Sequence, residues 1–201
     1  FTHADRFPLL RRFFKVKLEE HFETMFRAFD DNDLALEWCE NRLLESALPV
    51  AEALGGLVPH REYELFAGLD DGEVATVSAL FQRQAYHPGE AIIRVGEEAN
   101  HLFFIARASV SVLINLPSGT PKRLATLSAG MAFGEMAVID RAPRSAIIQA
   151  DGDVECDLLT VDGLNRLGQT HPAISIKLLQ NLSLGLCRKL RKANREIGIL
   201  E

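Results

Sequence analysis

The sequence of 201 residues is poor in cysteine and has no C-x-x-C pair. Its three cysteines, Cys39, Cys156 and Cys187, lie far apart, and no histidine stands at metal-ligand spacing from them. Disulfide scaffolds and zinc sites need closely spaced thiol or imidazole groups. We therefore expect no disulfide framework, no metal site and no cofactor, and a reducing cytoplasmic environment.

Positive charge is also scarce, because 22 Lys and Arg stand against 28 Asp and Glu, for a net charge of −6. A nucleic-acid surface needs a concentrated positive face, so we expect no nucleic-acid partner. No apolar run approaches the roughly 20 residues that span a bilayer, and we find no signal peptide. The chain begins with Phe1 and not Met. We interpret it as part of a longer protein, either a cytoplasmic one or the cytoplasmic part of a membrane protein.

No pattern of catalytic residues stands out in the sequence. The six histidines are scattered, and none is placed by the sequence near a candidate Ser or Cys. Covalent catalysis needs a nucleophile within hydrogen-bond reach of a base. We expect no catalytic residue in this chain, so it is not an enzyme by itself.

Hydrophobic residues make up 47% of the sequence, which is ample for a packed core. From Gln84 their spacing changes from a helical period to alternation. Short apolar segments occur at 91–95, 102–105, 110–114, 123–127, 145–150 and 154–160, separated by Gly, Pro, Asn and Asp. Many short strands at this spacing predict an antiparallel β-roll of the jelly-roll or double-stranded β-helix kind. Helical spacing on both sides of it makes the fold class α+β, a roll flanked by N- and C-terminal helices.

The N-terminal part is predicted to be helical. Apolar spacing favours a helix over 7–29 and a second one over 34–44, with 30–33 as its cap. The stretch 46–59 contains two prolines and a Gly-Gly pair and predicts a linker. We therefore divide the chain into a helical segment with its linker, residues 1–60, and a second domain, residues 61–201.

The C-terminal part is predicted to hold a short helix over 162–170 and a long one over 173–200. The long helix carries an apolar stripe of Leu179, Leu182, Leu186, Leu190, Ala193 and Ile197. This stripe exceeds what one roll can cover. One alternative for the surplus is a homodimer in which the same helix of a second copy packs against it.

The stretch 133–146 concentrates groups that suit an anionic ligand. Gly134 lets the backbone come close to a ligand, and small residues around it allow successive N–H groups to point one way. Arg144 can fork onto two phosphate oxygens, and Glu135 can accept from sugar hydroxyls. A cation for phosphate beside a carboxylate for ribose predicts a nucleotide site.

The pattern F-G-E-x-A-x(6)-R-[ST]-A of this stretch resembles the phosphate-binding cassette of cyclic nucleotide-binding domains, the type found in cAMP receptor proteins and protein kinase A regulatory subunits. The resemblance extends over about 63–197 and includes H-P-G-E at 87–90 and V-G-E at 95–97. It implies a regulatory module that binds a cyclic nucleotide, cyclic AMP in preference to cyclic GMP, and relays it to a larger host protein. The alternative is a degenerate fold that acts as an interaction or dimerisation module without ligand.

The resemblance also implies which residues hold the ligand. Arg144, Ser145 and Ala146 would hold the cyclic phosphate, and Gly134, Glu135 and Ala137 the ribose. Six further residues are candidates for the base: Val112, Ala125 and Leu127 on the roll, and Arg188, Arg191 and Asn194 on the last helix. Relatives usually have Gly where this chain has Ala108, so we expect that turn to be strained or remodelled.

A second resemblance concerns the residues 33–44, D-L-A-L-E-W-C-E-N-R-L-L. They resemble the closing helix of STAS domains, as found before cyclic nucleotide-binding domains in bacterial sulfate-permease-type transporters and in certain glutaminases. This implies upstream domains of a host protein as partners. An ordinary amphipathic helix is the other interpretation of the same residues.

Overall fold

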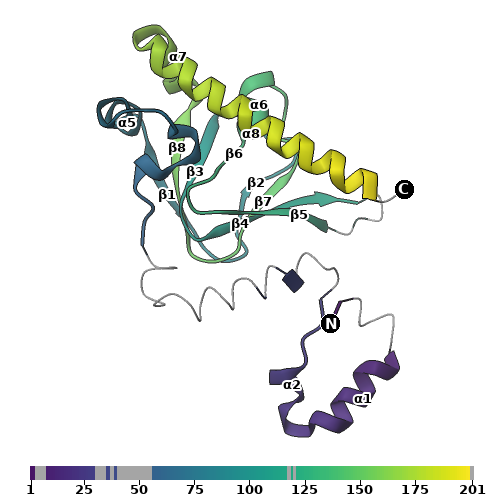
Figure 1. Cartoon of the computed structure of the whole chain (residues 1–201). Coiled ribbons are helices and arrows are strands. Elements are labelled where there is room, and N and C mark those ends of the chain that lie inside the picture. Colours follow the sequence, from purple (N-terminus) through teal and green to yellow (C-terminus); the bar gives the residue numbers. More distant parts are fainter. Residues whose placement is uncertain are drawn as a thin grey trace. The chain divides into compact units, whose positions relative to one another are not determined.

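A computed structural model of the chain describes residues 1–2, 8–29, 35–36, 39, 56–116, 119 and 121–199. The chain divides into two compact units, residues 1–54 and 55–201 (Figure 1). The predicted cap at 30–33, most of the helix at 34–44 and most of the linker at 46–59 lie outside the described residues. No helix in the described part of the chain is both long and apolar enough to cross a membrane.

The first unit has a broken helix where the sequence predicts a continuous one over 7–29. It consists of α1 (Pro8–Leu18), the 3-10 helix η2 (Glu19–His21) and α2 (Phe22–Met25). Glu19 has a φ of 45°, which no α-helix tolerates, and Phe26 is extended. The side chains of Phe22 and Phe26 are nevertheless buried, with Phe14 and Leu18 packed on them. The prediction of one long helix was therefore wrong, although its apolar residues do form a cluster.

The second unit is an antiparallel roll between helices (Figure 1). It opens with η3 (His60–Glu62), η4 (Glu64–Phe66) and α5 (Asp71–Ser78). The strands are β1 (Gln82–Tyr86), β2 (Ala91–Ile93), β3 (His101–Arg107), β4 (Ser109–Asn115), β5 (Pro121–Ser128), β6 (Ala132–Phe133), β7 (Ile147–Ala150) and β8 (Val154–Thr160), with α6 (Glu135–Asp140) between β6 and β7. The helices α7 (Val161–Thr170) and α8 (Pro172–Ile199) close the chain. The strands form two antiparallel sheets, ordered β1-β8-β3-β6 and β2-β7-β4-β5, which confirms the predicted fold class.

The sequence predicts a capped helix over 70–83, and the structure departs from this near residue 80. Asp70 caps α5 as expected, because its carboxylate accepts from the Glu73 N–H at 2.9 Å while Glu73 accepts from the Asp70 N–H. However, α5 ends at Ser78, and the next residues form β1. In β1 every residue except Tyr86 is exposed. An edge strand of this kind shows no apolar alternation, so periodicity could not reveal it.

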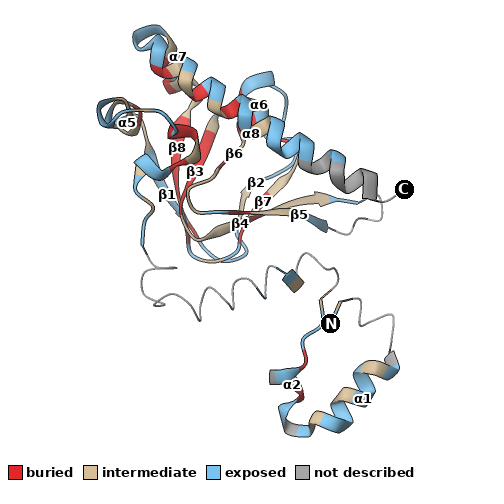
Figure 2. Ribbon diagram, in the orientation of Figure 1, coloured by how far each residue is buried: buried red, intermediate tan, exposed pale blue. Residues whose placement is uncertain are grey.

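Strand β3 supplies the core on both of its faces (Figure 2). Leu102, Phe104 and Ala106 belong to the cluster under the helices, together with residues of η4, α7 and α8. Phe103 and Ile105 belong to the second cluster, between the two sheets. Because side chains alternate along a strand, a strand buried on both faces is apolar throughout. This explains why the continuous run at 102–105 marks the centre of the domain.

Helix α8 docks through a face that differs from the predicted stripe in its first turns. Ile174, Leu178 and Leu182 are buried, whereas Leu179 and Leu190 are 45% and 62% exposed. Of the predicted stripe, Leu182 packs on the roll, whereas Leu179 and Leu190 lie outside that contact. The sequence offers two overlapping apolar faces on this helix, and spacing alone does not say which one meets the roll.

The turn at Ala108 keeps the geometry that suits glycine. Ala108 has a φ of 64°, in the left-handed region, between β3 and β4. The turn is thus strained and not remodelled, at a cost of about 1 kcal/mol.

A buried carboxylate ties the start of the second unit to the roll. Asp157 on β8 is 2% exposed and accepts from the Tyr63 hydroxyl at 2.7 Å and from Arg83 Nε and Nη2 at 2.8 and 2.9 Å. His60 Nε2 lies 3.0 Å from the same carboxylate. Burial opposes ionisation of Asp157, but the hydrogen bonds from Arg83 and Tyr63 outweigh it and lower its pKa. Residues 60–63 are therefore fixed to β8 and β1.

We predict that Asp157→Asn lowers the free energy of unfolding at pH 7 by about 2 kcal/mol, because Arg83 loses its charged partner. A carboxyl group whose pKa is lower in the folded than in the unfolded state stabilises the folded protein at pH values above its unfolded pKa of about 4. This contribution is lost as the pH falls below about 4 and through the folded-state pKa. Urea unfolding should show the gap between wild type and Asp157→Asn shrinking between pH 7 and pH 3. Tyr63→Phe serves as the milder comparison, at about 1 kcal/mol. An equal gap at both pH values would contradict the assignment.

Candidate functional site

The stretch singled out in the sequence forms a short helix between two left-handed residues. Gly134, with φ 80°, follows β6 and caps α6, and Arg141, with φ 58°, ends it. The cap of α6 has no side-chain hydrogen bond. The N–H groups of the first turn of α6 are thus left to a ligand or to solvent.

Arg144 is buried in the loop that follows α6. Its Nη1 donates to the Gly134 carbonyl and its Nη2 to the His101 carbonyl, both at 2.7 Å. The guanidinium carbon lies 5.7 Å from the centre of the Phe103 ring. A methyl group at position 134 would lie 2.7 Å from Nη1, so only glycine lets the guanidinium sit there.

The charge of Arg144 has no carboxylate partner at ion-pair distance among the described residues. Burial lowers the pKa of Arg144 from its ordinary value, and the more distant Glu97 and Glu135 oppose that shift. An arginine stays protonated even so. Arg144 therefore forms no ion pair with Glu135 or with Asp140, the two carboxylates of α6. A buried cation that two neutral carbonyls hold is suited to an incoming anion.

The loop before β3 holds the backbone of Arg144 through both its N–H and its carbonyl group. The Arg144 N–H donates to the Glu97 carbonyl at 2.9 Å, and the Gly96 N–H donates to the Arg144 carbonyl at 2.9 Å. Together with the His101 carbonyl, these contacts position Arg144 from the β2–β3 loop. Sequence reasoning quoted Val95-Gly96-Glu97 only as part of a pattern and gave His101 no role, since backbone acceptors leave no signal in residue types.

The two residues after Arg144 carry unused donors. Ser145 is exposed and Ala146 half-buried. No acceptor for either backbone N–H is found among the described residues. The chain therefore presents a guanidinium and two N–H groups in succession, which is an arrangement that binds phosphate oxygens.

Glu135 has a cationic partner from α8. The residue Glu135 is 7% exposed. Its Oε1 accepts a hydrogen bond from Lys189 Nζ at 2.7 Å. Oε2 has no hydrogen bond from another described residue. Sequence reasoning missed Lys189 and named Arg188, Arg191 and Asn194, which all lie on an exposed stretch of α8. Spacing alone could not single out Lys189, because it does not say which face of α8 meets the roll.

The three roll residues that were candidates for the base lie on neighbouring strands. Val112 on β4 pairs directly with Ala125 on β5, and Leu127 pairs with Val110. Leu127 is buried in the cluster between the sheets, and Val112 packs against it. The structure brings these three residues together on β4 and β5. Ala137 lies in α6, in the same short helix as Glu135.

The described residues contain no group of three or more His, Cys, Asp or Glu side chains close enough to hold a metal ion.

The family comparison matches residues 83–171 to the model of the cyclic nucleotide-binding domain. This range contains the roll except for Gln82, together with α6, Arg144 and all of α7. It agrees with the resemblance found in the motif. The range leaves out the segment before residue 83 and the whole of α8.

Three relatives are similar to this chain. "Glutaminase 2" of Bradyrhizobium diazoefficiens is 36% identical over 87% of this chain, which spans only 27% of that protein. The "Cyclic AMP receptor protein" of Thermus thermophilus is 32% identical over 68% of this chain and 61% of the relative. The crystal structure of the catabolite activator protein of Thermus thermophilus superposes with a TM-score of 0.62 at 32% identity, over 68% of this chain and 62% of that one. The chain thus spans about a quarter of the glutaminase and about three fifths of the receptor.

We predict that Gly134→Ala lowers the free energy of unfolding by about 1 to 2 kcal/mol, because φ 80° is strained for alanine and the new methyl group meets Arg144. Gly185→Ala is the control. Gly185 lies inside α8 with no atom within 4 Å of an added methyl group, so this change should stabilise by about 1 kcal/mol. Urea unfolding of both variants measures the difference. If Gly134→Ala is as well tolerated as Gly185→Ala, the close approach of Arg144 to residue 134 is refuted.

Proposed function

We propose that the cyclic nucleotide-binding domain to which residues 83–171 belong acts in this chain as a regulatory module. Its ligand is a cyclic nucleotide, cyclic AMP in preference to cyclic GMP, and no other cofactor. The bound state is relayed through α8 and the segment 56–66 to the rest of a larger host protein. Catalysis, if the host has any, takes place outside this domain.

The observation that carries this proposal is the buried Arg144. The guanidinium has five N–H donors, and the Gly134 and His101 carbonyls engage two of them. The remaining donors, with the N–H groups of Ser145 and Ala146, can hold the oxygens of a cyclic phosphate. Such charge-assisted contacts are worth about 1.5 to 3 kcal/mol each. The fixed backbone acceptors keep the guanidinium in place before the ligand arrives, which reduces the cost of ordering it.

The ribose is assigned to Gly134, Glu135 and Ala137. Lys189 holds Oε1 of Glu135, so Oε2 is the oxygen that accepts from the ribose 2′-hydroxyl. Lys189 thereby acts as a positioning residue for Glu135 and connects the ribose site to α8. Gly134 and Ala137 contribute backbone N–H groups from the two ends of the first turn of α6.

The base is assigned to the apolar surface of Val112, Ala125 and Leu127, with Arg188, Arg191 and Asn194 on the far side. A flat apolar surface accepts either purine. The preference for cyclic AMP rests on Ser145, since relatives that prefer cyclic GMP often have Thr at this position.

The relay is proposed to run from α8 to the segment 56–66. Asn181 Nδ2 donates to the Leu65 and Ala67 carbonyls at 2.8 and 2.9 Å, and Lys177 pairs with Glu73 at 2.6 Å. The exposed Ile176, Leu179 and Leu190 of α8 are the surface through which two copies would form a homodimer.

The host protein is proposed to be of the glutaminase type, with a STAS domain upstream. A match over 87% of the chain extends into residues 1–60, because residues 61–201 make up only about 70% of the sequence. The N-terminal segment, including 33–44, is then the end of that STAS domain. The reading frame upstream of Phe1 decides between a glutaminase, a transporter and neither.

A second candidate function is an interaction module that binds no nucleotide. The ion pair between Glu135 and Lys189 favours it, because a carboxylate already held by a lysine has less charge to offer to a hydroxyl group. Titration with cyclic AMP separates the two candidates.

We predict that the chain binds cyclic AMP and that Arg144→Ala weakens binding at least tenfold, the equivalent of about 1.4 kcal/mol. Calorimetric titration measures this. Arg144→Lys keeps the charge but loses the fork and should also bind more weakly. The exposed Arg166 provides the matched control, since Arg166→Ala should leave affinity unchanged. Wild-type affinity in a folded Arg144→Ala protein would refute the phosphate assignment, and so would the absence of any binding to the wild type. In competition titration, cyclic GMP should bind more weakly than cyclic AMP.

We also predict that cyclic AMP slows amide hydrogen exchange in α6 and in residues 186–199 of α8. The ion pair between Glu135 and Lys189 connects this part of α8 to the proposed ribose site, so ordering Glu135 should also order it. In Lys189→Ala the effect on 186–199 should disappear, with affinity reduced about threefold to tenfold. Lys177→Ala, which removes a contact of the first half of α8, is the comparison. Unchanged exchange throughout 173–199 in the wild type would exclude α8 as the relay.

A further inference from the structure

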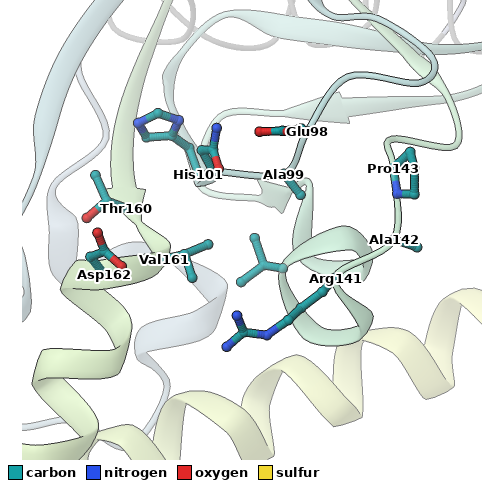
Figure 3. Close-up of a pocket in the computed structure, with 11 residues that line it drawn as sticks. Glu98, Ala99, His101, Arg141, Ala142, Pro143, Thr160, Val161 and Asp162 are labelled. Carbon is teal, nitrogen blue, oxygen red and sulfur yellow. The ribbon is translucent and has the colours of Figure 1, made fainter.

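A second hollow lies beside the candidate nucleotide site, with a volume of about 640 Å³ (Figure 3). Its walls are the residues just before and at the start of β3, the loop that follows α6, and the junction of β8 with α7. None of the residues assigned above to phosphate, ribose or base lines it. Its volume lies within the range of small-molecule sites, about 300 to 1,000 Å³.

Charges of both signs line this hollow without pairing. Arg141 contributes a guanidinium, and Glu98 and Asp162 contribute carboxylates. Among the described residues, none of the three has an ion-pair partner. Figure 3 shows the Arg141 side chain extending from the end of α6 toward the side of the hollow where Val161 and Asp162 lie.

The backbone at Arg141 has an unusual conformation for an arginine. Its φ of 58° is a left-handed value that favours glycine or asparagine, yet the chain has an arginine there. Between the charged groups the lining is apolar, with Val138, Val161 and Pro143. The hollow thus combines one cation, two anions and an apolar floor.

We propose that this hollow binds a small zwitterion of the α-amino acid type. The ligand carboxylate is held by Arg141, the ammonium group by Glu98 and Asp162, and the side chain packs on Val138, Val161 and Pro143. An anion without an ammonium group would be repelled by the two carboxylates, and a simple cation would face the guanidinium. A molecule that carries both charges satisfies all three groups at once.

The segments that line the hollow also position Arg144. His101 lines the hollow, and its carbonyl accepts from Arg144 Nη2 at 2.7 Å. Arg141, Ala142 and Pro143 line the hollow and lead directly into Arg144. A ligand in the hollow therefore changes the affinity of Arg144 for phosphate, and a cyclic nucleotide changes the affinity of the hollow by the same factor. This coupling, unlike the binding itself, rests on the proposed function.

The test is calorimetric titration of the whole 201-residue chain with L-glutamine and L-leucine, in the absence of nucleotide. Two derivatives of each serve as controls: the N-acetyl compound lacks the ammonium group and the amide lacks the carboxylate. We expect at least one of the amino acids to bind and both of its derivatives to bind at least tenfold more weakly. No binding of either amino acid up to about 10 mM would overturn the proposal. Equal binding of a derivative would overturn it too.

Variants locate the binding in the hollow. Arg141→Gln and Asp162→Asn should each weaken amino-acid binding at least tenfold, whereas Arg166→Gln should not. Arg141→Gly suits the left-handed backbone and so keeps the fold while removing the guanidinium. Wild-type affinity in a folded Arg141→Gly protein would refute the site. Repeating the titration with saturating cyclic AMP tests the coupling. Amino-acid binding that persists in a chain without affinity for cyclic AMP would leave the hollow in place and refute only the nucleotide site.

Discussion

The position of one guanidinium between two backbone carbonyls is the constraint on which the rest of the site depends. Arg144 reaches the Gly134 and His101 carbonyls only because residue 134 has no side chain and because the β2–β3 loop holds the backbone at 144. Taking a cation out of water is expensive unless its donors are satisfied. The two carbonyls accept hydrogen bonds from two of the N–H donors of the guanidinium but do not neutralise its charge. What remains is a fixed positive charge with spare N–H donors, an arrangement that suits an anion.

The polar anchors of the second unit join elements that are distant in the sequence. Asp157 fixes Tyr63 and Arg83 to β8, and Asn181 fixes the carbonyls of 65 and 67 to α8. Apart from the bond to the Ala67 carbonyl, these hydrogen bonds are buried or partly buried, where losing a partner costs more than at the surface. The segment 56–67 is therefore held by both the roll and α8. The proposed relay toward the N-terminus uses these contacts, since they connect α8 to this segment.

The sequence predicted the fold and located the stretch around the buried Arg144, but it did not predict the face of α8 that meets the roll. The fold was predictable because short apolar segments bounded by Gly, Pro, Asn and Asp indicate strands. A continuous apolar run such as 102–105 indicates a strand that is buried on both faces. The motif around Arg144 is local, so residue types at fixed spacing were enough to find it. Lys189 was missed because α8 carries two apolar faces, and only packing against Leu65 and Phe66 selects the one with Leu178 and Leu182. His101 was missed because it acts through its carbonyl, which every residue has. The roles of the individual site residues remain predictions.

Helix α8 consists of two halves with different attachments, and Gly185 lies between them. The first half is attached to the roll through three buried side chains, Ile174, Leu178 and Leu182. Lys177 and Asn181 add polar contacts. Beyond Gly185 the described side chains are mostly exposed, and the ion pair of Lys189 with Glu135 is one contact there. A half-helix with mostly exposed side chains opens at lower cost than one held by three buried apolar side chains. Local opening of α8 is therefore expected to begin in its second half, which is the half that the proposed relay requires to move.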